Sequence, residues 1–299
     1  GGDALVLAVG ARPRPPAWCG PGTQVVTADR LYLDDGPLPA RLVVLGGGWQ
    51  ATGAAGLFRA LGCEVTLVFA DADPLAGFDA ELRRHVGDAL AGAGVRLRPQ
   101  TRVSAVTAGG RRRAVETDAG VLAAERVVLA GDGPPIPNTD HLGLAALGVA
   151  TTPEGAIYVD TRYATRRAGV FAIGDCADHA GHGLAPATFD YASIAAVEGS
   201  RLAEHLAGAP PAPLDYDRQP LIVPGRPALA TVGLAEDRAR ALGLRVAARG
   251  RILDGDRFAK LVVDADGGEV VGCHLAGAGA GAALERVVAA LAADADAAT

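Results

Sequence analysis

The chain has 299 residues, 49% hydrophobic and 21% charged, so it can bury a sizeable core and is not predicted to be disordered. Its net charge of −6 argues against nucleic acid or an anionic membrane as a partner, and no stretch of about 18 residues is apolar enough for a transmembrane helix. The four cysteines form no CxxC pair, which favours reduced thiols in a cytoplasmic protein over a disulfide framework or a zinc site.

Residues 1–40 contain a single buried strand, from Ala4 to Gly10, followed by a proline-rich extended stretch. One interior strand lacks partners of its own, so residues 1–38 are predicted to be the remnant of a domain with its linker. The chain starts with Gly1 and contains no Met, and we therefore expect a fragment or a trimmed chain.

A predicted strand at residues 42–45, a glycine turn, a helix at residues 51–61 and a second strand at residues 64–68 come next. This order is typical of a dinucleotide-binding βαβ unit, in which free N–H groups at the helix start face the phosphates. Gly46 would allow the tight turn, Gly48 the approach of a pyrophosphate, and Ala51 close packing of helix on strand. A plain turn between strand and helix is the alternative. The candidate nucleotide-binding residues are Gly46, Gly47, Gly48, Trp49, Gln50 and Ala51.

The end of the second strand bears on the choice of nucleotide. Phe69 stands there, and its side chain cannot accept a hydrogen bond from a ribose hydroxyl. Asp71 and Asp73 follow and could reach the ribose, and no Arg is placed to hold a 2′-phosphate. The sequence therefore favours NAD over NADP, with impaired binding of both as the alternative.

The pattern continues with a helix over residues 78–93, for which Asp79 is the predicted N-cap. Strands are predicted at 95–97, 103–107, 114–117 and 127–130, with hairpin turns at residues 109–110 and 119–120. The inserted antiparallel pair completes a nucleotide-binding domain over residues 39–132, and residues 131–138 form a linker.

Two further domains are predicted. Residues 133–208 contain strands at 157–160 and 170–173, the second running into Gly174 and Asp175, and a helix at 192–206. Residues 209–299 have a different character, with strands at 228–232, 245–248, 260–263 and 270–275 and helices at 237–242 and 282–293. This last part is predicted to be a separate α+β unit with a hairpin turn at residues 267–268.

Several of these blocks, in this order, resemble the FAD-dependent pyridine nucleotide-disulfide oxidoreductases. The resembling blocks are residues 3–13, 42–51, 170–175, 184–187, 230–234 and 260–264. The resemblance implies an α/β fold, in which a Rossmann-like NAD(P) domain is inserted in an FAD domain of the three-layer ββα type. A C-terminal α+β dimerisation domain follows. It also implies cofactor contacts at Gly10, Gly131, Gly174, Asp175 and Ala187, with Asp175 accepting a hydrogen bond from a ribitol hydroxyl of FAD.

The function implied by the resemblance is transfer of hydride from nicotinamide to flavin and on to a disulfide-type acceptor, in a homodimer formed through residues 209–299. The redox dithiol and the catalytic His and Glu of the family are not recognisable in this chain, so no catalytic residue is assigned and the chain alone is expected to be inactive, with weak affinity for FAD. Cys176 is predicted to be a structural thiol. His179 and His182 are predicted to lie on a flexible loop rather than in a metal site.

Some positions depart from the family pattern. Gly53 stands where the family usually has a Glu near the nicotinamide, and the Arg expected in residues 131–138 is not recognisable. A non-catalytic scaffold that binds cofactors or dimerises is therefore an alternative. A flavin enzyme without a dithiol is a third possibility, although residues 209–299 argue against the ferredoxin reductase type.

Overall fold

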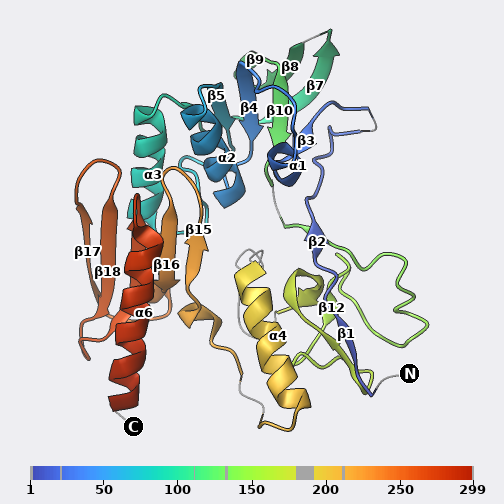
Figure 1. Cartoon of the computed structure of the whole chain (residues 1–299), viewed down its shortest axis with the longest axis vertical. Helices are drawn as coiled ribbons and strands as arrows, with labels where there is room; N and C mark the ends of the chain where they lie inside the picture. Colours follow the sequence, from blue (N-terminus) through green and yellow to red (C-terminus); the bar gives the residue numbers. More distant parts are fainter. Residues whose placement is uncertain are drawn as a thin grey trace. The chain divides into compact units, whose positions relative to one another are not determined.

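The computed structural model describes residues 3–20, 22–110, 112–131, 134–179, 192–210 and 213–297 (Figure 1). The chain forms two compact units. The first consists of Gly1–Arg14 and Gly133–Tyr216, and the second of Pro15–Asp132 and Asp217–Thr299. Each unit therefore combines segments that are distant in the sequence.

The second unit contains a parallel sheet with the strand order β3-β10-β4-β5-β6. Leu42 pairs with Val65 and Leu45 with Val68, and all four side chains are buried, as is usual for parallel strands covered on both faces. The predicted strand, turn, helix and strand are confirmed. The elements are β3 (Val26–Thr27), α1 (Ala28–Tyr32), β4 (Arg41–Leu45), α2 (Trp49–Ala60), β5 (Glu64–Val68), α3 (Ala80–Gly92), β6 (Arg96–Arg98) and β10 (Arg126–Leu129).

Helix α3 begins where the sequence predicts. The Asp79 side chain is its N-cap and accepts hydrogen bonds from the backbone N–H groups of Glu81 and Leu82. The inserted antiparallel sheet has the order β7-β8-β9, with β7 (Val103–Gly109), β8 (Arg112–Thr117) and β9 (Gly120–Ala124). Both predicted hairpin turns are confirmed, but the predicted pair is a sheet with a further strand, β9.

The rest of the second unit is an antiparallel sheet in the order β15-β16-β19-β18-β17. Helix α6 packs on β16 and β19, and α3 contacts β18 and β19 (Figure 1). The α+β character predicted for this segment is confirmed. Its elements are β15 (Leu221–Val223), β16 (Leu229–Gly233), α5 (Glu236–Ala241), β17 (Val246–Ile252), β18 (Phe258–Asp264), β19 (Val270–Ala276) and α6 (Ala280–Ala297).

The first unit is built from short strands around a small apolar core. β1 (Leu5–Leu7) pairs in parallel with β13 (Val170–Ala172), and β12 (Ile157–Tyr158) pairs in parallel with β14 (Ala177–Asp178). β2 (Ala11–Arg12) pairs antiparallel with β11 (Ile136–Pro137), so the linker predicted over residues 131–138 contains a short strand. The 3-10 helix η1 (Gly174–Cys176) follows β13, and helix α4 (Ala192–Leu206) closes the segment.

Candidate functional site

The glycine turn lies at the corner between β4 and α2. Gly46 has a φ of +121°, and a Cβ at this position would lie 2.8 Å from the Ala130 carbonyl oxygen and 2.9 Å from that of Gly131. Gly46 is therefore required for both its conformation and its lack of a side chain. Gly48 differs, because it is the N-cap of α2 with a φ of −75° and an added Cβ would meet no described atom within 4 Å.

The other predicted residues of this site surround the turn. Trp49 and Gln50 begin α2 and are half-buried, and Ala51 is fully buried against the sheet. The Gln50 side-chain oxygen approaches Gly131, which has a φ of +71°. Gly48 has open space around its backbone, and no side chain among the described residues caps the start of α2, as suits a helix N-terminus that receives an anion.

Phe69 and Asp71 occupy different environments. The Phe69 side chain is buried beneath the turn, and a Cβ on Gly47 would lie 3.1 Å from the Phe69 Cβ. Asp71 is exposed, and its backbone carbonyl accepts a hydrogen bond from the Gln100 N–H at 3.0 Å. The Phe69 side chain thus packs against Gly47 of the turn, and Asp71 is exposed to solvent.

Gly53 has a steric reason to be glycine. A Cβ there would lie 3.2 Å from the Pro224 carbonyl oxygen, and a Cβ on Gly56, one turn later, would lie 2.0 Å from the Arg226 carbonyl oxygen. The segment that leads into the C-terminal sheet therefore packs directly on α2. A glutamate at position 53 could be accommodated only if this segment moved.

A second corner lies in the first unit, where β13 ends. Gly174 has a φ of +67°, and Asp175 follows it in η1 with a half-buried side chain. Among the described residues, no hydrogen-bond partner reaches the buried Oδ1 atom of Asp175. Burial, together with the nearby Glu198 carboxylate, raises the pKa of Asp175, and His179 acts in the opposite direction. An oxygen in this state is a ready acceptor for a ligand hydroxyl.

Gly10 lies near this second corner. It has a φ of +63°, its carbonyl accepts a hydrogen bond from the Asn138 N–H at 2.9 Å, and its backbone lies close to Cys176. The buried Cys176 thiol donates to the carbonyl oxygens of Ile173 and Leu7, and burial raises its pKa, as suits a structural thiol. Ala187 and His182 lie outside the described residues.

His179 lies just after β14, outside any helix or strand. This side chain is buried and lies within hydrogen-bond distance of Gly174 and Tyr216 and 3.5 Å from Glu198. Glu198, which the structure buries completely on α4, was not predicted as a functional residue from the sequence. A signal was present, because Glu198 stands midway between Ile194 and Leu202 in a buried stripe with helical spacing.

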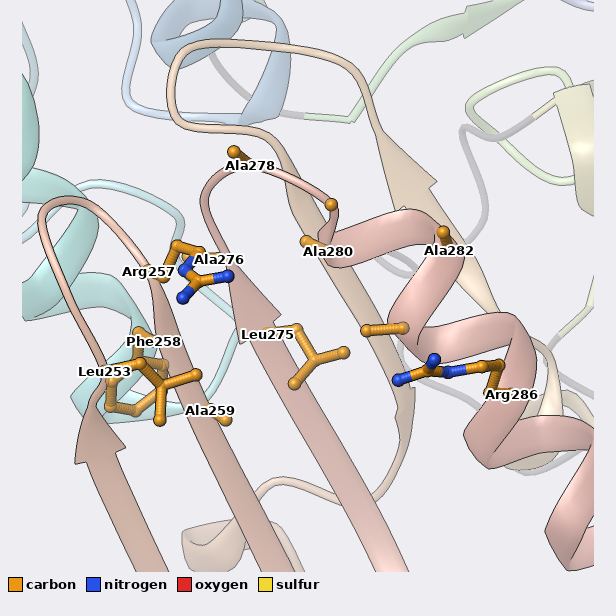
Figure 2. Close-up of a pocket in the computed structure, with 12 residues that line it drawn as sticks. Leu253, Arg257, Phe258, Ala259, Leu275, Ala276, Ala278, Ala280, Ala282 and Arg286 are labelled. Atoms are coloured by element: carbon orange, nitrogen blue, oxygen red, sulfur yellow. The ribbon is translucent and has the colours of Figure 1, made fainter.

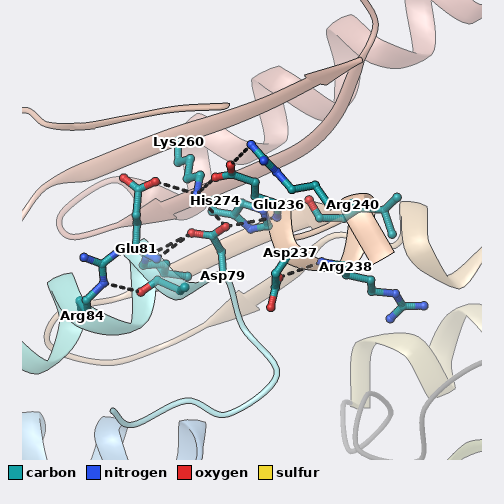
Figure 3. A network of polar contacts seen from close by, with 12 residues as sticks. Asp79, Glu81, Arg84, Glu236, Asp237, Arg238, Arg240, Lys260 and His274 are labelled. Atoms are coloured by element: carbon teal, nitrogen blue, oxygen red, sulfur yellow. Dashed lines mark hydrogen bonds and ion pairs between the residues drawn. The ribbon is translucent and has the colours of Figure 1, made fainter. Parts of the chain in front are cut away.

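A buried charge cluster, also missed from the sequence, joins α3 to the C-terminal sheet (Figure 3). The Lys260 ammonium on β18 lies 3.0 Å from Asp79, 2.8 Å from Glu81 and 2.8 Å from Glu236. The Lys260 side chain is only 2% exposed. A lysine so deeply buried is stable because carboxylates surround it on several sides.

A hollow of 310 Å³ lies between β18, β19 and the start of α6 (Figure 2). Leu253, Phe258 and Leu275 line it, and Arg257 and Arg286 flank it. None of the predicted site residues lines this hollow. Within the described part of the chain, no group of His, Cys, Asp or Glu side chains is arranged to hold a metal, and no helix is long and apolar enough to cross a membrane.

Comparison with known proteins identifies the family. Residues 1–199 match the family described as pyridine nucleotide-disulphide oxidoreductase, and residues 220–299 match the dimerisation domain of that family. The chain belongs to the pyridine nucleotide-disulphide oxidoreductase family. The family resemblance and the fold class predicted from the sequence are therefore confirmed.

Individual relatives agree with this assignment. The chain is 32% identical to a glutathione reductase from Burkholderia cepacia, over 96% of this chain and 64% of the relative. It is 29% identical to a mercuric reductase from Shewanella putrefaciens, over 91% of this chain and 48% of the relative. The chain thus spans about half to two thirds of the length of these curated relatives.

Two solved structures have a similar fold. The crystal structure of LpdA from Mycobacterium tuberculosis matches with a TM-score of 0.82 and 26% identity, over 97% of this chain and 63% of that one. The HOCl-induced flavoprotein disulfide reductase RclA from Escherichia coli matches with a TM-score of 0.84 and 22% identity, over 97% of this chain and 67% of that one. At that identity, RclA bears on the fold alone.

Proposed function

We propose that the protein is an FAD- and NAD(P)-dependent oxidoreductase that passes hydride from nicotinamide to flavin and on to a disulfide-type acceptor. The observation that carries this proposal is the buried Asp175 oxygen without a partner among the described residues, directly after the left-handed Gly174. Leaving a buried acceptor unpaired costs about 1–3 kcal/mol, and a flavin hydroxyl would remove that cost. Membership of a family of flavin-dependent oxidoreductases supports the same function.

The chain supplies binding groups for two cofactors. Asp175 would accept a hydrogen bond from a ribityl hydroxyl of FAD, and Gly10, where an added Cβ would meet no described atom within 4 Å, leaves room for close approach of a ligand to the backbone. Gly48 and the N-terminus of α2 would receive the pyrophosphate of the nicotinamide dinucleotide. Bound FAD would supply the hydride and electron chemistry, while these residues bind and orient it.

We infer that NAD is the nicotinamide cofactor rather than NADP. Asp71 is exposed just beyond β5, where an acid can accept hydrogen bonds from the ribose and repels a 2′-phosphate. All four cysteines, which lie in the described residues, are unpaired, in keeping with the reducing cytoplasm. Residues 209–299 would form a homodimer, since their greater part matches a dimerisation domain.

The test is reconstitution of the full-length protein with FAD, followed by titration with NADH and NADPH under anaerobic conditions. We expect a yellow holoprotein that NADH reduces more readily than NADPH. Asp175→Asn should raise the dissociation constant of FAD about tenfold, because the charge-assisted hydrogen bond is lost. The control is Glu154→Gln, which alters an exposed acid in the same unit and should leave FAD affinity unchanged. A colourless wild-type protein would refute the proposal.

A non-catalytic, cofactor-binding or dimerising scaffold is the second candidate, and the packing around Gly53 favours it. A Cβ at position 53 would lie only 3.2 Å from the Pro224 carbonyl oxygen, and the first turn of α2 contains no acidic residue to approach a nicotinamide. The two candidates differ in the reductive titration. A scaffold would bind FAD without reduction by NADH or NADPH, whereas the enzyme would show bleaching of the flavin absorbance.

A further inference from the structure

Behind the Gly174–Asp175 corner lies a carboxylate with no access to solvent. The Glu198 side chain on α4 is 0% exposed, although its neighbours in the buried stripe, Ile194 and Leu202, are apolar. Removing a carboxylate from water is costly unless hydrogen bonds replace its hydration. The partners of Glu198 therefore indicate what this residue does.

Each carboxylate oxygen of Glu198 has its own partner. Oε2 accepts a hydrogen bond from the Gly174 backbone N–H at 2.6 Å, and Oε1 accepts one from the Tyr216 hydroxyl at 2.8 Å. His179 approaches the same oxygen as Tyr216, with its Nε2 atom 3.5 Å from Glu198 Oε1. Two acceptor oxygens facing donors from two directions require a carboxylate, because an amide would present an NH₂ group to one of them.

His179 extends this network to the other side of Gly174. Its Nε2 atom lies 3.3 Å from the Gly174 carbonyl oxygen, and its Nδ1 atom lies 3.3 Å from the Tyr216 hydroxyl. Both backbone polar groups of Gly174 are thus held by buried side chains of one connected network. A Cβ at Gly174 would also lie 3.1 Å from the Ala195 Cβ, so the residue is fixed sterically as well.

The network around Gly174 affects the next residue, Asp175. Its side-chain direction follows from the conformation of Gly174, whose φ of +67° only glycine adopts readily. The Asp175 Oδ1 atom is buried and lacks a partner among the described residues, so no hydrogen bond to a described residue fixes this oxygen. The network around Glu198 is therefore the part of this unit that can hold the carboxylate in place.

We propose that Glu198 is a positioning residue of the flavin site, which acts through the Gly174 N–H to aim the Asp175 carboxylate at a hydroxyl of the ligand. The inference rests on the proposed function, in which that ligand is FAD. His179 and Tyr216 support Glu198 by filling its remaining hydrogen-bonding capacity. None of these residues needs to touch the flavin.

A double-mutant cycle on the full-length protein tests this inference, with FAD affinity measured by quenching of flavin fluorescence. Glu198→Gln and Asp175→Asn should each raise the dissociation constant about tenfold. If Glu198 acts through Asp175, the double variant should also be about tenfold weaker, whereas independent effects would multiply to about a hundredfold. The control is Glu204→Gln, an exposed acid on the same helix.

The pH profile of FAD affinity separates positioning from a purely structural role. Among the described residues, the titratable groups that act on Asp175 are Glu198 on α4 and His179 after β14. Tyr216 bonds Glu198, and Tyr163 interacts with Tyr216. Affinity should fall on acidification as Asp175 becomes protonated. Glu198→Gln should move this fall to lower pH, because the Glu198 charge raises the pKa of Asp175, and Asp175→Asn should abolish it.

The outcomes are distinct. A wild-type protein that binds no FAD would overturn both the proposed function and this inference. A wild-type protein that binds FAD, with unchanged affinity in Glu198→Gln or with multiplicative effects in the double variant, would overturn the inference alone. Thermal unfolding of each variant shows whether it is folded. Glu198→Gln is used because it keeps the shape of the side chain and removes only its charge.

Discussion

Three consecutive glycines at residues 46–48 meet three different physical requirements. Gly46 has a positive φ, and a Cβ at this position would clash with the carbonyl oxygens of Ala130 and Gly131. Gly47 faces the buried ring of Phe69, and Gly48 faces open space at the start of α2. The first glycine is therefore needed for folding, and the third is available for a ligand.

This difference predicts that alanine at position 46 mainly lowers stability, whereas alanine at position 48 mainly weakens dinucleotide binding. Gly46→Ala should lower the free energy of unfolding by about 2 kcal/mol, because it adds backbone strain and a clash with main-chain atoms. Gly48→Ala should lower stability by less, only by the small cost of alanine at an N-cap, but should weaken dinucleotide binding about tenfold by placing a methyl group where the pyrophosphate approaches. Urea unfolding and titration with NADH measure the two quantities. The assignment of Gly48 to the phosphate site would be contradicted by unchanged NADH affinity in the folded Gly48→Ala variant.

The roles of individual residues could be predicted from the sequence where neighbouring residues define them. The role of Asp79 as an N-cap and the position of the glycine turn follow from neighbouring residues alone. Glu198 and His179 are different, because they are 19 residues apart in the sequence and meet only when α4 packs against η1. Their buried network depends on tertiary structure, which no local pattern encodes.

Among the secondary-structure elements, α3 is joined to the C-terminal sheet by charge as well as by apolar packing. The N-cap residue Asp79 bonds the start of α3 through one oxygen, and its other oxygen lies 3.0 Å from Lys260 and 3.4 Å from the N–H of Glu236 at the start of α5. The buried carboxylate thus ties two helix N-termini to one lysine on β18. His85 adds to this junction by stacking on Phe258.

The junction should be sensitive to loss of the lysine. Lys260→Met should lower the free energy of unfolding by about 3 kcal/mol, at the lower end of the cost of breaking a buried ion pair, since Glu81 and Glu236 keep some access to solvent. Chemical unfolding at neutral pH measures this change. The control is Arg245→Met, which removes an exposed ion pair with Asp266 and should have only a small effect.

The same variant predicts a change in pH dependence. The hydrogen bond from Lys260 lowers the pKa of Glu236, and Lys260 also lowers that of Asp79 against the opposing effect of burial. These groups stabilise the wild type above their unfolded pKa values of 4.5 and 3.8, and the stabilisation is lost as the pH falls through their lower folded values. The stability difference between wild type and Lys260→Met should therefore be largest near pH 7 and narrow on acidification. A difference that stays constant as the pH falls well below both unfolded values would show that the lysine acts only by packing.

The elements that the sequence predicted are those with their own periodic pattern. β4, α2, β5 and α3 each carry a continuous apolar stretch or an apolar face, and their bounds were close to those found. The short strands β2 and β11 were missed because each consists of two residues and is defined by a partner more than 120 positions away. Such strands form because the tertiary fold brings them together, and the local sequence does not predict them.

For the whole molecule, the family assignment was predictable because several weak motifs occur in one order along nearly the entire chain. No single motif was specific, but glycine turns, an acid after a strand and a C-terminal α+β segment together match the family now shown. The division into compact units was less accessible. Residues 15–132 and 217–299 form one unit, and this grouping depends on the packing of residues 224–226 on α2 and on the charge cluster at Lys260.

The proposed homodimer gives the last prediction. Ile252 and Leu253, at the end of β17 and just beyond it, are 65% and 53% exposed, and they lie in the segment that matches a dimerisation domain. Large apolar side chains in such a segment are expected to be covered by a partner. Sedimentation equilibrium of the wild type should give twice the mass of one chain, and Leu253→Asp should raise the dimer dissociation constant about tenfold by placing a charge in the interface. Leu33→Asp is a matched control, because Leu33 is even more exposed, at 83%, but lies outside residues 209–299. Equal dimer affinity in the two variants would exclude Leu253 from the interface, and a wild type that remains monomeric at high concentration would contradict the dimer itself.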